Sequence, residues 1–327
     1  MRWILVFALA QAACTTPVPF DTDDSDTGTE DTDVPELIQW VDRTIETSAT
    51  LNAVYTGGRG AFVVGDDGLA WRITEGNADA VVTNVRSRLM GVWGDGDGGT
   101  VDLTAAGYAG SVLNWNGESY DKVESDALGT TNFEDIDGEP GDLTAVSATG
   151  IHRLSEGAWS FESNGFNHAL RSLYVGSGGK AVAVGELGVV LVREGDVWSE
   201  LANSSRKGLV DVHGSKDEIW MVGARGTVLR LEGGTVIEVE SPTTVNLHGV
   251  WVASSGRVYV VGNNGASFMW DPDMPPADDD TDPTPGGWEQ LATGAQSNLY
   301  AVHGSDEENI WAVGNRGAVY RYLGPKE

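Results

Sequence analysis

The sequence is poor in cysteine and in positive charge, and both shortages exclude classes of protein. One cysteine, Cys14, stands among 327 residues, so no internal disulfide can form and packing must stabilise the fold. The 20 Lys and Arg residues are outnumbered by 49 Asp and Glu residues, which gives a formal net charge of −29. A surface of this sign repels phosphate backbones and anionic lipid. We therefore expect no nucleic-acid partner and no direct binding to a membrane surface.

The apolar run at the start of the sequence is too short to span a bilayer, which takes about 20 apolar residues in a helix. It lies within MRWILVFALAQAA, residues 1–13, where Arg2 precedes the apolar stretch and small residues follow it. This order is typical of a secretory signal peptide. We expect residues 1–13 to direct the chain across the inner membrane of a Gram-negative bacterium.

Cys14 directly follows these small residues, and a signal that ends in this way resembles the lipobox of bacterial lipoproteins. The resemblance implies that Cys14 becomes a lipidated N-terminus and that Thr15 favours the outer membrane. Gln11 departs from the pattern, because the family prefers Leu there. The alternative is ordinary cleavage after Ala12, which leaves Cys14 as a spare thiol.

Residues 14–36 are expected to form an acidic, disordered tether. Eight acids lie between Asp21 and Glu36, with no base and almost no large apolar side chain. Such a segment cannot bury enough surface to fold, and its like charges extend it. Its Asp-x-Asp spacing is also found in calcium loops, but the glycine and the final bidentate glutamate of such a loop are missing.

A repeat of about 40 residues follows the tether. Each unit opens with an L-x-x-V-like segment and continues with a short apolar run that ends in Gly-x-x-Gly; in the third unit Ser147 takes the place of the first glycine. The seven units start at Leu51, Leu89, Phe133, Leu170, Leu209, Leu247 and Leu299. Each unit has room for four short strands, A to D, and the second glycine suits the positive φ of a tight B–C turn. Helical periodicity is absent, which excludes a helical solenoid.

Four strands per 40 residues are typical of a β-propeller blade, so we predict an all-β, seven-bladed propeller. The last unit supplies strands A, B and C only. A spare strand stands before the first unit, and its Trp40 precedes Leu51 by 11 residues, as Trp159, Trp198 and Trp288 precede the next units. We predict that residues 37–46 close the ring as the outer strand of the last blade, within one domain of residues 37–324. The structural alternative is a linear array.

The repeats IWAVGNRGAVYR, IWMVGARGTVLR and VYVVGNNGASF resemble those of secreted bacterial propellers with WAVG-x-x-G-type blades. This broad family includes photosystem II assembly factor-like and sialidase-like (BNR) repeat proteins. The resemblance implies blade architecture and no particular activity. The sialidase Asp-box, S-x-D-x-G-x-x-W, is absent, so the resemblance brings no catalytic apparatus.

The loops of the expected ring differ between its two faces. The B–C turns are short and uniform, whereas the A–B loops vary, and an acidic, proline-rich insertion at 271–287 falls between strands C and D of the sixth unit. A–B and C–D loops lie on the same face of a propeller. Variable loops on a rigid scaffold are common recognition sites, so this face is the expected binding face.

The residue four places after each A-strand start is aromatic or histidine in six of the seven units. These candidate ligand-binding residues are Tyr55, Trp93, Tyr174, His213, Trp251 and His303, and the seventh position holds Asp137. Inward side chains at these positions would ring one mouth of the channel, where they could stack on sugars or hold a peptide. The alternative is that they pack between blades. No matching carboxylate–histidine–nucleophile pattern accompanies His213 and His303, so their position in the repeat explains them better than catalysis does.

The sequence therefore predicts a non-enzymatic binding or scaffold module that recognises an envelope protein or a glycan through its A–B/C–D face. We expect a monomer without cofactor or metal, held at the outer membrane by a lipid anchor alone and either periplasmic or surface-exposed. Two alternatives remain open. One is an extracellular glycan-active hydrolase or lyase, and the other is an assembly factor for another envelope protein.

Overall fold

A computed structural model of the protein describes residues 40–58, 60–96, 102–162, 168–215, 218–274 and 287–324. The predictions for the signal peptide, Cys14 and the tether, and for most of the insertion at 271–287, lie outside the described residues. Among the described residues, no helix has the length and apolar character needed to cross a membrane.

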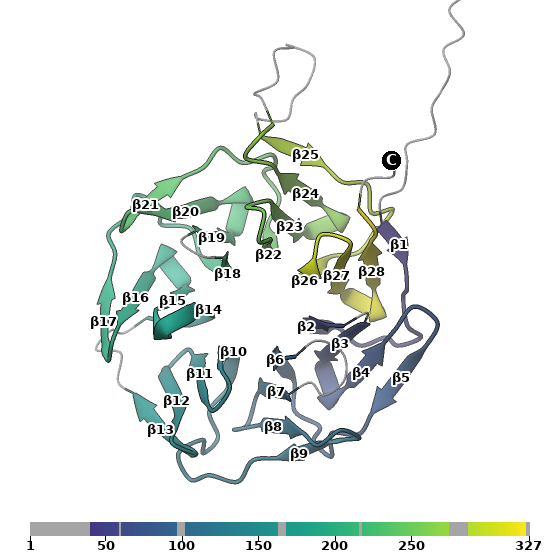
Figure 1. Ribbon diagram of the computed structural model, residues 1–327, viewed down its shortest axis with the longest axis vertical. Helices are drawn as coiled ribbons and strands as arrows, with labels where there is room; N and C mark the ends of the chain where they lie inside the picture. Colours follow the sequence, from purple (N-terminus) through teal and green to yellow (C-terminus); the bar gives the residue numbers. More distant parts are fainter. Residues whose placement is uncertain are drawn as a thin grey trace, which may run out of the picture. The chain divides into compact units, whose positions relative to one another are not determined.

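Seven four-stranded antiparallel sheets form a ring around a central channel (Figure 1), which confirms the predicted propeller. Blade one comprises β2 (Leu51–Gly57), β3 (Gly60–Gly65), β4 (Ala70–Ile73) and β5 (Ala78–Val81). Blade two comprises β6 (Leu89–Asp95), β7 (Asp102–Gly107), β8 (Val112–Trp115) and β9 (Tyr120–Lys122). Blade three comprises β10 (Phe133–Glu139), β11 (Asp142–Ser147), β12 (Gly150–Ser155) and β13 (Ala158–Glu162).

The remaining blades repeat this order from the channel outward. Blade four comprises β14 (Leu170–Val175), β15 (Ala181–Gly185), β16 (Val190–Glu194) and β17 (Val197–Glu200). Blade five comprises β18 (Leu209–Ser215), β19 (Glu218–Gly223), β20 (Val228–Glu232) and β21 (Thr235–Glu238). Blade six comprises β22 (Leu247–Val252), β23 (Val258–Gly262), β24 (Ser267–Trp270) and β25 (Trp288–Gln290). Blade seven comprises β26 (Leu299–Asp306), β27 (Asn309–Gly314), β28 (Val319–Tyr322) and β1 (Trp40–Asp42).

The ring closes as predicted, because β1 supplies the outer strand of blade seven. Trp40 pairs with Tyr322 and Asp42 with Tyr320, and the hydrogen bond from the Ile45 amide to Gly317 continues the contact beyond β1. Figure 1 shows the first strand beside the last one. The Trp40 side chain is 1% exposed, and its ring centroid lies 5.4 Å from that of Tyr322.

The apolar pattern of the repeat accounts for the core. The residue that starts each A strand is fully buried in all seven blades, and the B strands of neighbouring blades pack against it. Five B–C turns contain a short 3-10 turn: η1 (Asp66–Gly68), η3 (Glu186–Gly188), η4 (Ala224–Gly226), η5 (Asn263–Gly265) and η6 (Asn315–Gly317). A sixth, η2 (Ser177–Gly179), lies in the A–B loop of blade four.

The second glycine of the B–C turn is required for steric as well as conformational reasons. In blade five, Gly226 has φ +66°, and a Cβ there would lie 1.8 Å from the carbonyl oxygen of Thr243. The predicted positive φ is therefore confirmed. The turn also touches the D–A connection, so it packs as tightly as the core does.

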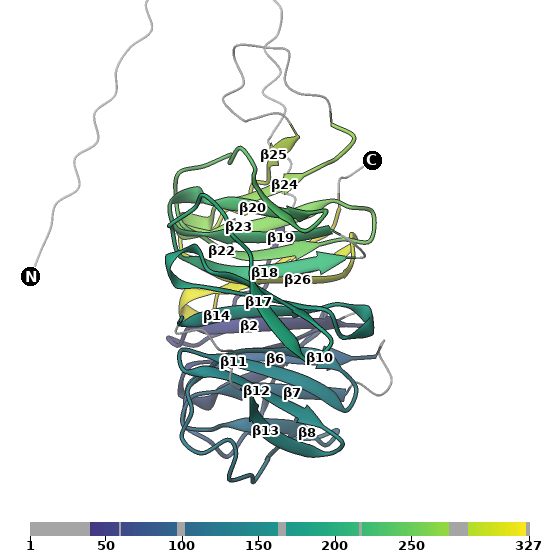
Figure 2. The ribbon, with the colours of Figure 1, turned by 90° about the vertical axis from the view of Figure 1, so that its left-hand side faces the viewer.

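Every A strand has an irregularity in its pairing immediately after its first residue. Such a bulge places an extra residue against the partner strand. We count the first residue of each A strand as position zero. Positions one, two and four of most A strands face the channel, whereas positions zero, three and five are mostly buried in the blades. Figure 2 shows the ring from the side, with the blades seen edge-on.

Candidate binding site in the central channel

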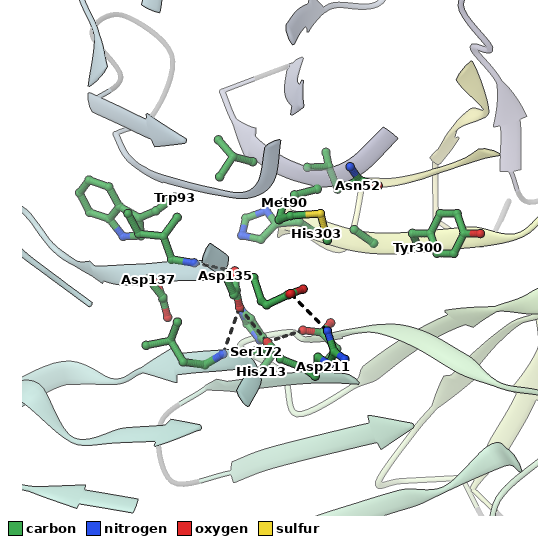
Figure 3. A pocket seen from close by; sticks show the side chains of 18 of the residues that line it. Asn52, Met90, Trp93, Asp135, Asp137, Ser172, Asp211, His213, Tyr300 and His303 are labelled. Atoms are coloured by element: carbon green, nitrogen blue, oxygen red, sulfur yellow. Dashed lines mark hydrogen bonds and ion pairs between the residues drawn. The ribbon is translucent and has the colours of Figure 1, made fainter. Parts of the chain in front are cut away.

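The channel contains a cavity of about 550 Å³ that is lined by residues from all seven A strands (Figure 3). At the end formed by D–A connections and B–C turns, its lining includes Thr50, Asp66 and Arg88. At the other end it reaches the position-four residues, and no described residue of an A–B loop lines it. The cavity thus occupies the D–A/B–C part of the channel.

Charged and polar side chains gather at the D–A/B–C end of this cavity. Arg88 pairs with Asp66 at 2.7 Å. Arg171 bridges Glu134 at 3.2 Å and Glu186 at 2.6 Å. Both arginines are therefore held in place by carboxylates, Arg88 by one and Arg171 by two, and present fixed donors at the wall.

Six of the seven position-four residues line the inner end of the cavity. Of the predicted binding residues, Tyr55, Trp93, Tyr174, His213 and His303 lie there, together with Asp137. Trp251 does not line the cavity; it is 5% exposed, and its ring centroid lies 5.6 Å from that of Tyr259.

The rings at this level contact one another across and around the channel. The centroids of Tyr55 and His303 are 5.2 Å apart, and those of Tyr174 and His213 are 5.4 Å apart. His213 and His303 belong to blades five and seven, which are not adjacent in the ring, yet their centroids lie 6.1 Å apart. The position-four residues therefore form a layer across the channel.

Three position-four residues fasten their blade to the next one by a hydrogen bond. In each case a side-chain atom accepts a bond from the backbone N–H at position five of the following A strand. The pairs are His303 Nδ1 with Thr56 at 3.0 Å, His213 Nδ1 with Val252 at 3.1 Å, and Asp137 Oδ2 with Val175 at 2.7 Å.

The other four position-four residues are aromatic, and each of them is followed in the next blade by a glycine at position five. The pairs are Tyr55 with Gly94, Trp93 with Gly138, Tyr174 with Gly214, and Trp251 with Gly304. A Cβ on Gly94 would lie 2.5 Å from the Tyr55 ring, and one on Gly304 would lie 2.8 Å from the Trp251 ring. Trp93 also donates from Nε1 to the Gly138 carbonyl at 2.9 Å. At Gly94, Gly214 and Gly304 the glycine thus makes room for the ring, whereas a Cβ at Gly138 would meet the carbonyl oxygen of Asp142 at 2.3 Å.

These contacts favour the packing role that the sequence left open for the position-four residues. The glycine at position five of the next unit is the sequence signal for this packing. Sequence reasoning missed it, because the signal appears only when position four of one unit is compared with position five of the next. The predicted ligand contacts through these six residues stay a prediction.

The two histidines are held neutral. Burial lowers the pKa of His303 to about 4, and burial together with the charge of His303 lowers that of His213 to about 3. In both rings Nδ1 accepts a backbone hydrogen bond, so protonation there would break the contact to the next blade.

A polar group that sequence reasoning missed lies on the same wall, at position two. Ser172 Oγ is 2.8 Å from Asp135 Oδ2 and 2.8 Å from Asp211 Oδ1 (Figure 3). Position two lies on the same face as position four, but the three residues come from three different blades, which no single repeat unit brings together. In the described part of the chain, no three His, Cys, Asp or Glu side chains converge as metal ligands would.

No family model and no curated protein matches the chain. Solved structures do match. YCF48 bound to D1 peptide has a TM-score of 0.68 and 17% identity over 88% of this chain and 96% of that chain. YCF48 from Cyanidioschyzon merolae has a TM-score of 0.65 and 15% identity, covering 86% and 98%. The WD40 β-propeller domain of Doa1 has a TM-score of 0.72 and 12% identity, covering 87% and 96%. At these identities the likeness concerns the fold alone: the chain is a seven-bladed β-propeller similar to YCF48 and to a WD40 propeller.

Proposed function

We propose that the protein is a non-enzymatic binding module of the cell envelope that holds an extended segment of a partner protein in its central channel. The observation that carries the proposal is the cavity of about 550 Å³ with its fixed polar wall. Pockets of this size and character are the usual places for ligand recognition. YCF48, which has the same fold, has been solved with a bound peptide.

The geometry favours entry of the segment from the D–A/B–C mouth. The cavity lies at that end, and both of its arginines are already paired, Arg88 with Asp66 and Arg171 with Glu134. Backbone amides and uncharged side chains of a partner segment would meet hydrogen-bond donors and acceptors there. The A–B/C–D face expected from the sequence is the alternative, and the experiment below separates the two.

We further propose that Cys14 anchors the protein to the outer membrane and that residues 15–36 tether the propeller to this anchor. An envelope protein awaiting assembly is one partner that such a tethered holder would serve.

The test is site-specific photo-crosslinking in the native envelope with the full-length protein. One version carries the photoreactive residue in place of Met90, which lines the cavity. A matched version carries it in place of Lys180, which is exposed in the A–B loop of blade four. A third combines the Met90 probe with Val210→Trp, which fills the cavity from the opposite wall. Melting curves check that each version is folded.

We expect protein adducts from the Met90 probe that disappear when Val210→Trp blocks the cavity. Adducts from the Lys180 probe alone, unchanged by the block, would place recognition on the A–B/C–D face. Folded protein that yields no protein adduct at either site would contradict a protein-holding function and turn attention to a glycan.

A further inference from the structure

The Asp135–Ser172–Asp211 chain joins three neighbouring blades at the cavity wall. Asp135 lies on β10, Ser172 on β14 and Asp211 on β18, each at position two of its strand. The serine is 3% exposed. The two carboxyl groups show part of their surface to the cavity but lie deep inside the ring. No other hydroxyl–carboxyl contact in the described residues links three blades.

If both carboxyl groups are ionised, the Asp135–Ser172–Asp211 hydrogen-bond chain has one hydrogen too few for its two oxygen–oxygen contacts. A serine hydroxyl has one hydrogen to donate, yet Ser172 Oγ lies 2.8 Å from an oxygen of each aspartate. With two carboxylates, one of these contacts would bring two lone pairs together without a hydrogen between them. A proton on either aspartate supplies the missing hydrogen.

The other donors around the chain cannot supply that hydrogen. Asp135 accepts backbone N–H bonds from Leu173 at 3.0 Å and Ile136 at 2.8 Å. Asp211 accepts equivalent bonds from Val250 at 2.8 Å and Val212 at 3.0 Å. Each of these amide hydrogens already points at a carboxyl oxygen and not at the serine.

We propose that Asp135 and Asp211 share one proton through Ser172, and that this proton-sharing bridge makes the wall formed by blades three to five sensitive to pH. With the proton present, every close oxygen contact contains a hydrogen. Without it, two negative charges compete for one hydroxyl hydrogen and the three innermost strands lose part of their connection.

The charged groups near the bridge do not replace the proton. The titratable or charged side chains at the channel on its own strands and on the neighbouring β22 are Glu134, Asp137, Arg171, Tyr174, His213 and His248, and β26 adds Tyr300 and His303. Arg171, the one permanent cation among them, is occupied by Glu134 and Glu186. No described Arg, Lys or His forms an ion pair with Asp135 or Asp211.

The local environment favours a proton on this pair below about pH 7. Burial raises the pKa of Asp135 to about 6, and burial with the charge of Asp135 raises that of Asp211 to about 7. Asp137 nearby has its pKa raised to about 7 by burial. Since the ordinary value for Asp is about 3.9, these aspartates bind more protons in the folded protein than in the unfolded chain between about pH 4 and pH 7. The bridge therefore stabilises most at the acidic end of that range, and its contribution is lost as the pH rises through about 7.

The direct test is a pH titration of the aspartate carboxyl carbons by NMR in the full-length, ¹³C-labelled protein. Asp135→Asn and Asp211→Asn assign the two signals. Asp142 is the internal control, because its bond to Arg153 lowers its pKa and keeps it ionised. We expect Asp135 and Asp211 together to release one proton near pH 6 to 7, while Asp142 does not change. Two fully ionised signals throughout that range would overturn the proposal.

A second measurement compares the unfolding equilibrium of the wild type with that of Asp211→Asn. The variant removes one of the two carboxyl groups, so the remaining one needs no shared proton. Between about pH 5 and pH 7 the unfolding constant of the wild type should rise relative to the variant by up to tenfold per pH unit, which is the effect of one proton. The histidines contribute equally to both proteins and cancel. Parallel pH profiles of two folded proteins would also overturn the proposal.

Discussion

The pairing of position four with position five in the next blade predicts that two harmful substitutions should partly cancel. Gly94→Val adds a side chain whose Cβ would lie 2.5 Å from the Tyr55 ring and 2.7 Å from a methyl of Leu103. Overpacking of this kind costs about 1–3 kcal/mol. Because the φ of Gly94 is not in the left-handed region, a valine can adopt the backbone conformation, and the cost arises from the Tyr55 ring and the Leu103 methyl.

Tyr55→His should relieve that cost. It would reproduce the arrangement of His213 with Val252, in which Nδ1 accepts the position-five N–H at 3.1 Å. A hydrogen bond of this kind contributes about 1 kcal/mol, and the smaller ring leaves room for the valine. Alone, Tyr55→His removes packing against Gly94 and destabilises.

The assay is a double-mutant cycle of unfolding free energies from urea denaturation. We expect the double variant to be more stable than the sum of the single effects predicts, with a coupling energy of at least about 1 kcal/mol. Gly76→Val is the matched control, because a Cβ at Gly76 meets nothing within 4 Å. It should show no coupling to Tyr55→His. Additive effects of Tyr55→His and Gly94→Val would refute the pairing rule.

Three further predictions concern closure, pH and the B–C turns. Trp40→Ala should lower the free energy of unfolding by about 3–5 kcal/mol, because it empties a fully buried site in the closing strand. Urea denaturation measures this loss, and a value below about 1 kcal/mol would contradict closure by β1. Folding lowers the pKa of His303 from about 6.5 to about 4, so this histidine binds its proton more readily in the unfolded chain. The free energy of unfolding should therefore fall by up to about 3 kcal/mol as the pH drops from about 6.5 to 4. His303→Asn, which keeps an acceptor, should lack this dependence, and a pH profile identical to that of the wild type would refute the assignment. Gly226→Ala should destabilise well beyond Gly233→Ala, since both residues have positive φ but a Cβ meets backbone only at Gly226; equal midpoints of thermal unfolding would show that the steric contact is unimportant.

The fold could be predicted from the sequence because each repeat unit marks the order of its strands with recognisable motifs. The L-x-x-V start, the apolar run and Gly-x-x-Gly mark strands A, B and C in each unit, and the spacing of Trp40 from Leu51 matches that of the later D-strand tryptophans. The closing strand was assigned to residues 37–46; β1 itself covers Trp40–Asp42, and its hydrogen bonds continue to Ile45.

The channel was only partly predictable, for a reason that lies in the A strands. Simple alternation places positions two and four on one face and position one on the other. The bulge after the first residue turns position one toward the channel as well, which brings Glu134 and Arg171 to the cavity. The bulge is a property of the packed ring and leaves no mark in a single unit, so Glu134 and Arg171 could not be foreseen. Asp135, Ser172 and Asp211 lie on the face that alternation assigns to the channel, but their contacts join three blades and exist only in the assembled ring.

The two types of position-four contact also bear on how a ring of similar blades keeps its order. Each aromatic residue at position four faces a glycine at position five of the next blade, whereas histidine or aspartate accepts a residue with a Cβ and caps its amide. At the junction of blades seven and one, His303 accepts a hydrogen bond from the Thr56 amide beside the channel. At the outer edge of blade seven, Trp40 pairs with Tyr322. A wrong neighbour, such as an aromatic residue against Thr56, would clash at the channel even where the outer strands could still pair. Closure in the correct register is therefore specified at both edges of blade seven, and the residues that specify it at the channel are the same ones that form the inner layer of the cavity.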